Sequence, residues 1–392
     1  MVSILLVVIY VAFISLGLPD SILGSAWPSM YKTLQVPIAS VGILSMMIAA
    51  GTIVSSLFSV RVVRRLGTGL VTAISVGLTA LALFGFSISG SFLALCLWCI
   101  PYGLGAGSVD AALNHYVALH YESRHMNWLH CFWGVGASLG PGIMGFCLTH
   151  GLRWNSGYQA VGGLQALLVL GLFLCVPLWN RHKPRTQQAE QPASTRMLDG
   201  LRVPGAWQTL LAFFCYCGLE TTTGLWASSY LVLDRGFARD AAASMASLFY
   251  LGITGGRLLS GFLSTRLGDR RMVRLGFAVL GGGVLLLLVR WSGWSMYAGL
   301  ILTGLGCAPI FPSLLHQTPD SFGVERSQML MGMQMASAYT GSTLMPPLFG
   351  LVAQFVSISL YPWLLVILLL TMIGLTERAT RILSVQQSAA QA

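Results

Sequence analysis

The stretch from Val2 to Trp27, VSILLVVIYVAFISLGLPDSILGSAW, is apolar and long enough to cross a membrane as one helix. It is too long and too weakly flanked by charge for a cleavable signal peptide, so we expect it to be the first membrane span. Apolar stretches of about eighteen residues or more recur along the whole chain. The sequence therefore predicts an all-α membrane protein.

The composition excludes most soluble functions. Only 9% of the residues are charged, whereas a soluble domain has about 25%. The net charge of +10 does not indicate nucleic-acid binding, because that function needs a basic, aromatic-rich groove on a water-facing surface. The eight cysteines are scattered through apolar segments, so we expect no disulfide framework, no metal site and no cofactor.

We predict twelve transmembrane helices in two six-helix bundles. Residues 1–180 are the first bundle, residues 181–204 a polar cytoplasmic linker, residues 205–380 the second bundle and residues 381–392 a cytoplasmic tail, disordered from Gln386. The spans are expected near 3–27, 38–62, 68–88, 92–118, 127–149, 157–179, 205–230, 241–265, 271–290, 294–315, 327–352 and 359–377.

The basic residues predict the orientation. With a cytoplasmic amino terminus, the outer loops keep only Lys32, Arg153, Arg235, Arg239 and Arg290, and nearly all other basic residues fall on the inner side. The positive-inside rule then places both termini in the cytoplasm. We expect a monomer in a bacterial inner membrane.

The two halves also contain similar loops. Span 2 leads into RVVRRLG at residues 61–67, and span 8 leads into STRLGDRR at residues 264–271. Corresponding loops in two six-span halves indicate a duplicated fold that works by alternating access.

These loops resemble the basic signature of the major facilitator superfamily, although Arg64 and Thr265 stand where the family usually has Asp.

More narrowly, most of the chain is similar to the fucose–proton symporter family. That resemblance implies a pseudo-symmetric major facilitator fold and proton-coupled symport of a small sugar. The residues that match are Gly17-Leu18-Pro19-Asp20, Trp27-Pro28, Gly103-Leu104-Gly105, Asp110-Ala111-Ala112-Leu113-Asn114, the segment 127–134 (NWLHCFWG), the segment 216–221 (YCGLET) and Gly256-Arg257.

Ionisable side chains inside spans are the main candidates for function, because each costs about 2.5–3.5 kcal/mol to insert. The resemblance places Asp110 at the family's proton-binding carboxylate, and Asn114 lies on the same helix face. A carboxyl group that loses its water is more easily protonated and can ionise again when water returns. We therefore expect Asp110 to couple transport to protons. A hydrogen bond within the helix bundle is the alternative role.

Glu220 stands in an apolar run where family members commonly have Gln. It is expected to bind sugar hydroxyls, or else a second proton or Na⁺. Asp20 follows Pro19 where span 1 is expected to break, and is a further coupling candidate, offset by about one helical turn from the family's carboxylate.

Asn127, His130 and Trp133 recur every three residues and share a stripe on span 5. Hydroxyls need hydrogen bonds and the C–H face of a sugar stacks on aromatic rings, so this stripe is a candidate sugar site. The alternative is that Trp133 only packs and His130 binds a carbonyl. Trp226 and Gln334 are further candidates for substrate contact.

Two other classes of function compete with sugar symport. The segment 136–142, GASLGPG, partly resembles the signature of antiporters, so a proton-coupled exporter of drugs or metabolites is the alternative, as is a Na⁺-coupled sugar symporter. A sensor or an intramembrane enzyme has no support, because His-Glu-x-x-His spacing is absent and Ser138 has no acid–base pair nearby in the sequence.

Overall fold

The computed structural model describes residues 4–120, 123–180, 201–289 and 293–391, and the regular elements in these ranges are all helices. The first half contains α1 (Ile4–Asp20), α2 (Ile22–Thr33), α3 (Val41–Leu66), α4 (Thr68–Ile88), α5 (Phe92–His120), α6 (Ser123–Thr149) and α7 (Trp154–Asn180). The second half contains α9 (Ala206–Leu233), α10 (Arg239–Leu267), α11 (Asp269–Leu288), α12 (Gly293–His316), α13 (Thr318–Phe322), α14 (Val324–Val352) and α15 (Tyr361–Gln391).

The all-α membrane fold is confirmed. In the described ranges, nine helical segments are long and apolar enough to cross a membrane, and the last of them, Leu330–Val385, includes parts of both α14 and α15. The helices α9 and α10 are not among the nine; α9 contains Glu220, and α10 contains Arg257. If α1 and α2 are one broken span and the short α13 is left out, the long helices correspond one to one with the predicted spans.

The last helix extends beyond the predicted end of the last span. The final span was expected to end near residue 377 and the tail from Gln386 to be disordered, but α15 continues to Gln391. The segment that follows Thr376 consists largely of Glu, Arg, Ala, Leu and Gln, which favour helix even outside a membrane. The predicted linker, in contrast, lies mostly at 181–200, outside the described residues.

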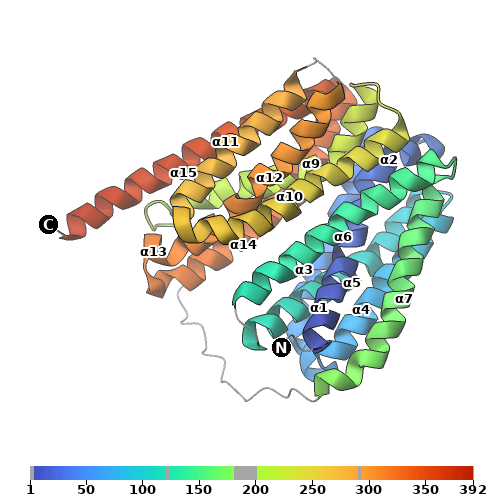
Figure 1. The fold of residues 1–392 in the computed structure, drawn as a ribbon, viewed down its shortest axis with the longest axis horizontal. Helices are drawn as coiled ribbons and strands as arrows, with labels where there is room; N and C mark the ends of the chain where they lie inside the picture. Colours follow the sequence, from blue (N-terminus) through green and yellow to red (C-terminus); the bar gives the residue numbers. More distant parts are fainter. Residues whose placement is uncertain (1–3, 121–122, 181–200, 290–292, 392) are drawn as a thin grey trace.

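The two halves repeat the same helix pairings (Figure 1). In the first half α1 packs on α6, and α5 packs on α3 and α4; in the second half α9 packs on α14, and α12 packs on α10 and α11. The similar loops found in the sequence occupy equivalent places in these repeats. Gly67 ends α3 and Gly268 ends α10, with φ of 79° and 72°. Glycine adopts this left-handed conformation without the cost of a Cβ, so both helices stop at the same point.

Contacts between the halves lie toward one end of the molecule. We call the end where α1 starts and α15 finishes the termini end. A Cβ placed on Gly145 would lie 2.0 Å from Ser244 Oγ, and one on Gly42 would lie 2.7 Å from Pro347 Cα. These contacts join α6 to α10 and α3 to α14 away from the termini end. Toward the termini end the two groups of helices diverge (Figure 1).

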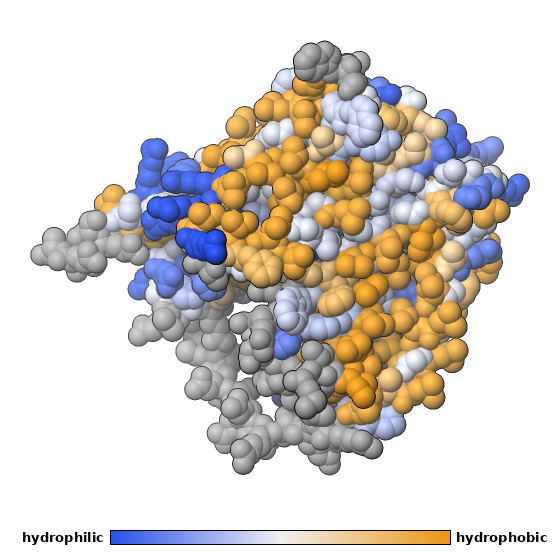
Figure 2. Space-filling model, viewed as in Figure 1, coloured by the Kyte–Doolittle hydropathy of each residue, from blue (hydrophilic) through white to orange (hydrophobic). Residues whose placement is uncertain are grey.

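The outer surface suits a lipid environment. On α7, Leu167, Leu170 and Leu174 are exposed, Leu174 to 83%. Figure 2 shows hydrophobic residues over most of one face and hydrophilic residues gathered toward the helix ends. An apolar band of this kind, too large for a soluble monomer, indicates contact with the membrane.

The glycine contacts inside the first half lead to a prediction. Gly17→Ala should destabilise the protein, because its Cβ would lie 2.0 Å from the carbonyl oxygen of Trp133 on the neighbouring helix. Overpacking of this kind costs about 1–3 kcal/mol, so the thermal unfolding midpoint of the detergent-solubilised protein should fall. Gly163→Ala is the control, because a Cβ there has no atom within 4 Å. Equal midpoints for the two variants would contradict the packing of α1 on α6.

Candidate functional site

Asp20 lies where the first span breaks, as predicted. The helix α1 ends at Asp20 and α2 begins at Ile22, and Pro19 precedes the break. Such breaks are tolerated where a span lines a cavity. Asp20 Oδ2 accepts a hydrogen bond of 2.9 Å from Trp133 Nε1, and the carboxylate is solvent-exposed although it lies at the centre of the span.

Trp133 brings the two halves together at this point. Its ring lies 5.4 Å from Arg257 Cζ and 6.3 Å, in an edge arrangement, from the ring of Tyr250. Both of these residues belong to α10, whereas Asp20 belongs to α1. An arginine over an aromatic face contributes about 0.5–2 kcal/mol, more when water is excluded. The indole therefore contacts a negative group from one half and a positive group from the other.

Arg257 also pairs with Glu220 on α9. The distance from Arg257 Nη2 to Glu220 Oε1 is 3.8 Å, and the two side chains are 20% and 17% exposed. The pair is thus mostly enclosed but still reaches water. We refer to Asp20, Trp133, Tyr250, Arg257 and Glu220 as the central cluster.

Asp110 and Asn114 form a second polar group, on α5. Asn114 Nδ2 donates hydrogen bonds to Asp110 Oδ1 at 2.8 Å and to the Asp110 carbonyl at 3.0 Å, so the predicted shared helix face is confirmed. Asp110 also interacts electrostatically with Asp20 of the central cluster.

Only part of the predicted stripe on α6 lies in the central cluster. Trp133 belongs to the central cluster. His130 packs edge-on against Phe13, with ring centroids 5.9 Å apart, and interacts electrostatically with Arg257. Asn127 lies one turn before His130 on the same helix, but its side chain is outside the described residues.

Two predicted substrate contacts lie elsewhere. Trp226 is fully buried, and its Nε1 donates to the Pro346 carbonyl at 2.9 Å in the contact between α9 and α14. Gln334 is 1% exposed, and its Oε1 accepts a hydrogen bond of 3.1 Å from Thr318. Both side chains bind partners within the second half in this conformation.

Sequence reasoning did not include Arg257 in the site. It fell within a predicted span, and the cost of inserting a charge was applied only to carboxylates and histidine. The same argument applied to arginine would have identified it. Tyr250 gave no such signal, because a tyrosine in a span is compatible with simple packing.

The central cluster is closed on one side. Between α6 and α10, a Cβ on Gly134 would lie 2.2 Å from Thr254 Oγ1 at the level of the cluster, and one on Gly145 would lie 2.0 Å from Ser244 Oγ, further from the termini end. Tyr339, at the middle of α14, is 51% exposed. With the opposite end closed, we infer that water reaches Asp20 from the termini end.

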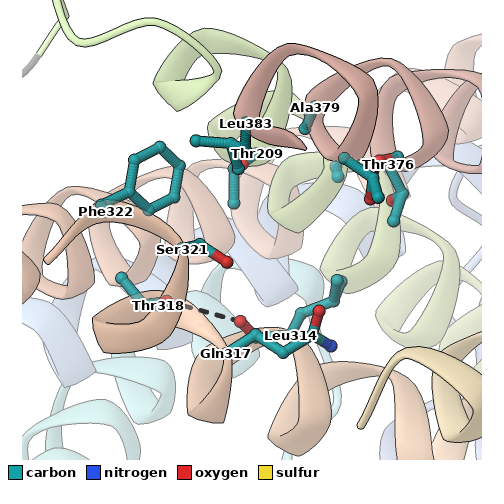
Figure 3. A pocket seen from close by; sticks show the side chains of 11 residues that line it. Thr209, Leu314, Gln317, Thr318, Ser321, Phe322, Thr376, Ala379 and Leu383 are labelled. Atoms are coloured by element: carbon teal, nitrogen blue, oxygen red, sulfur yellow. Dashed lines mark hydrogen bonds between the residues drawn. The ribbon is translucent and has the colours of Figure 1, made fainter. Parts of the chain in front are cut away.

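A separate pocket is lined by none of the predicted site residues, although Thr318 in its lining binds Gln334. It lies between α9, α12, α13 and α15 and has a volume of about 40 Å³ (Figure 3). Figure 3 shows Thr209, Gln317, Ser321 and Thr376 around it. A space of this size suits a few water molecules. It does not suit a sugar.

Comparisons with known proteins define the class. The family model of the Major Facilitator Superfamily matches residues 9–243 and 209–385. Bypass of stop codon protein 6 of Saccharomyces cerevisiae is 22% identical over 91% of this chain and 79% of its own length. The glucose/mannose transporter GlcP of Bacillus subtilis is 22% identical over 78% of this chain and 77% of its own.

The fold has a counterpart among solved structures. The crystal structure of the nucleoside transporter NupG aligns with a TM-score of 0.73 at 16% identity, covering 96% of this chain and 98% of that one. The family match over residues 9–243 and 209–385 identifies the chain as a membrane transporter. It belongs to the Major Facilitator Superfamily.

The pairing of Arg257 with Glu220 can be tested by a double-mutant cycle. Arg257→Met and Glu220→Gln should each lower the thermal stability of the purified protein, and the double variant should lose less than the sum of the two. We expect a coupling near the lower end of the range of about 0.5–3 kcal/mol for groups in contact, because both side chains keep some contact with water.

The control cycle combines Arg257→Met with Asp320→Asn, since Asp320 is exposed on α13. That cycle should be additive. Additivity in the Arg257 and Glu220 cycle as well would refute the ion pair.

Proposed function

We propose that this protein takes up a small sugar together with protons, by alternating access between the two halves. The observation that carries the proposal is the position of Trp133. Its ring lies between Asp20 of the first half and Arg257 of the second. An aromatic face bordered by charged hydrogen-bonding groups matches the chemistry of a sugar, which has a C–H face and a rim of hydroxyls.

The substrate contacts follow from this geometry. Trp133 and Tyr250 offer ring faces or edges, and Arg257 and Glu220 offer donors and acceptors for hydroxyls. His130 on α6 and Asn114 on α5 are further proposed contacts for the substrate. The name of the relative from Bacillus subtilis, a glucose/mannose transporter, supports a sugar as substrate.

The charges support coupling to protons. Asp20, Asp110 and Glu220 are three carboxylates in the central parts of their spans, and Arg257 supplies one positive charge. Uncompensated negative charge at this depth is costly, so uptake of a proton relieves it. Asp110 is the proposed coupling residue because its partner, Asn114, lies outside the central cluster. Asp20 and Glu220 instead pair with Trp133 and Arg257 of the cluster. Na⁺ could compensate the same charge and is the alternative.

Alternating access gives the contacts between α6 and α10 a role. The helices touch beyond the central cluster, so the site is open toward the termini end in this conformation. Opening to the other side requires Gly134 and Thr254 to separate. We propose that residues 1–180 and 205–380 move as two bodies about the site.

The basic residues support a cytoplasmic termini end. Arginines gather there at the end of α3, the start of α11 and the end of α15, at Arg61, Arg64, Arg65, Arg270, Arg271, Arg274, Arg378 and Arg381. By the positive-inside rule this end faces the cytoplasm. We propose a monomer in the inner membrane of a bacterium, with both termini inside.

A proton-coupled exporter is the second candidate. Three carboxylates around aromatic rings would also suit an organic cation, which binds carboxylates and ring faces. In that case, an outward substrate gradient should drive proton entry. Sugar binding would then be absent.

Asp110→Asn should abolish sugar accumulation driven by a pH gradient, because the amide cannot release a proton, while exchange of sugar across the membrane persists in part. The measurement is uptake of labelled glucose or mannose into proteoliposomes, with proton and sodium gradients imposed in turn. Asp320→Asn serves as the control. Retained gradient-driven accumulation in Asp110→Asn would overturn the coupling role.

Trp133→Leu should weaken sugar binding by about tenfold or more, because it removes both the ring face and the hydrogen bond to Asp20, each worth about 1 kcal/mol. Trp226→Phe is the matched control, since Trp226 lies in the packing of α9 on α14. Binding of the same two sugars is measured by the ligand-induced thermal shift. If the control weakens binding as strongly as Trp133→Leu, the substrate site lies elsewhere.

A further inference from the structure

A groove on the first half is separate from the central cluster. It lies between α3, α4 and α5 and has a volume of about 240 Å³. Its walls are aliphatic or aromatic apart from three serines, and include Val54, Phe58, Val62, Leu66 and Ile74. Phe58 is 50% exposed and Leu66 is 46% exposed. The groove therefore presents apolar side chains outward from the helices.

The length of the groove fits one leaflet of a membrane. Its wall on α3 runs from Val54 to Leu66, which at 1.5 Å per residue is about 18 Å of helix. Half of a hydrocarbon core about 30 Å thick is about 15 Å. An acyl chain of one leaflet can thus lie along the groove over most of its length.

Positive charge stands at the termini end of the groove. Residues 58, 61, 62, 65 and 66 fall on one stripe of α3, because positions three and four apart share a helix face. Arg61 Cζ lies 5.7 Å from the ring centroid of Phe58, which lines the groove. Arg64 lies about 120° or more around the helix from Phe58, Val62 and Leu66, which line the groove.

Nothing in this part of the sequence neutralises these arginines. Between Asp20 and Asp110 the chain contains no acidic residue. The second half differs just after the equivalent loop, on α11: Arg274 binds Glu377 through two hydrogen bonds of 2.8 and 2.9 Å, and Asp269 binds His316. The positive charge beside the groove is therefore available to an anion at the membrane surface.

We propose that this groove binds an anionic phospholipid, with one acyl chain along α3 and the phosphate on Arg61 and Arg65. Apolar contact gives the affinity for a chain of any phospholipid, and the arginines give the preference for an anionic headgroup. The proposal does not depend on the transported substrate. It concerns a face of the first half that lies outside the central cluster.

The test is native mass spectrometry of the full chain in detergent, with added phosphatidylglycerol or phosphatidylcholine. The unmodified protein should retain phosphatidylglycerol in preference. Arg61→Gln and Arg65→Gln should each reduce that preference about fivefold, the effect of about 1 kcal/mol per arginine near a charged headgroup. Arg64→Gln, the matched control, should reduce it much less.

The groove itself is tested by filling it. Ile74→Trp should lower the retention of both lipids, whereas Leu81→Trp should not, because Leu81 lies on the same face of α4 two turns away and does not line the groove. If Ile74→Trp fails to fold, the arginine variants decide, because they change only exposed side chains.

Three results would overturn the proposal. The first is equal retention of the two lipids by the unmodified protein. The second is an Arg64→Gln effect as large as that of Arg61→Gln. The third is a dimer that Ile74→Trp dissociates, because a second copy would then be the occupant of the groove.

Discussion

The cation of Arg257 is the constraint on which the rest of the site depends. A guanidinium in the middle of a membrane helix must find a negative partner or a polarisable face. Here it has both, Glu220 on its own side and the ring of Trp133 across the interface. Because Trp133 in turn binds Asp20, one buried charge fixes how α1, α6, α9 and α10 meet. The halves also meet through small-residue contacts, such as Gly145 with Ser244, and through the hydrogen bond from Thr149 to Asp240.

Local patterns were sufficient to predict the fold. The hydrophobic stretches set the number and positions of the long helices, and Pro19 with Gly17 marked the break between α1 and α2. The repeated Arg-Leu-Gly loops correctly indicated two related halves, because glycine at 67 and 268 ends equivalent helices. The end of α15 was missed since hydropathy signals where a helix leaves the membrane, whereas helix propensity decides where it stops.

The site was only partly predictable, because it depends on which side chains meet across helices far apart in the sequence. The rule that charges in spans face a cavity selected Asp20 and Glu220, which lie in the central cluster, and Asp110, which binds Asn114. It could not place Trp226 or Gln334, since an aromatic or amide side chain in a span serves packing and recognition equally well. Their actual partners, Pro346 and Thr318, lie on other helical turns that no local pattern links to them.

Besides the contacts of the central cluster, α6 meets α10 where glycines are set against hydroxyl side chains, at Gly134 with Thr254 and Gly145 with Ser244. These two contacts interlock no large side chains. Separating these contacts exposes little apolar area and requires few rotamer changes, so the two helix surfaces can come apart and meet again. A larger side chain at either glycine would collide with the opposite helix and slow each transport cycle. The slowing would grow with the strength of that contact.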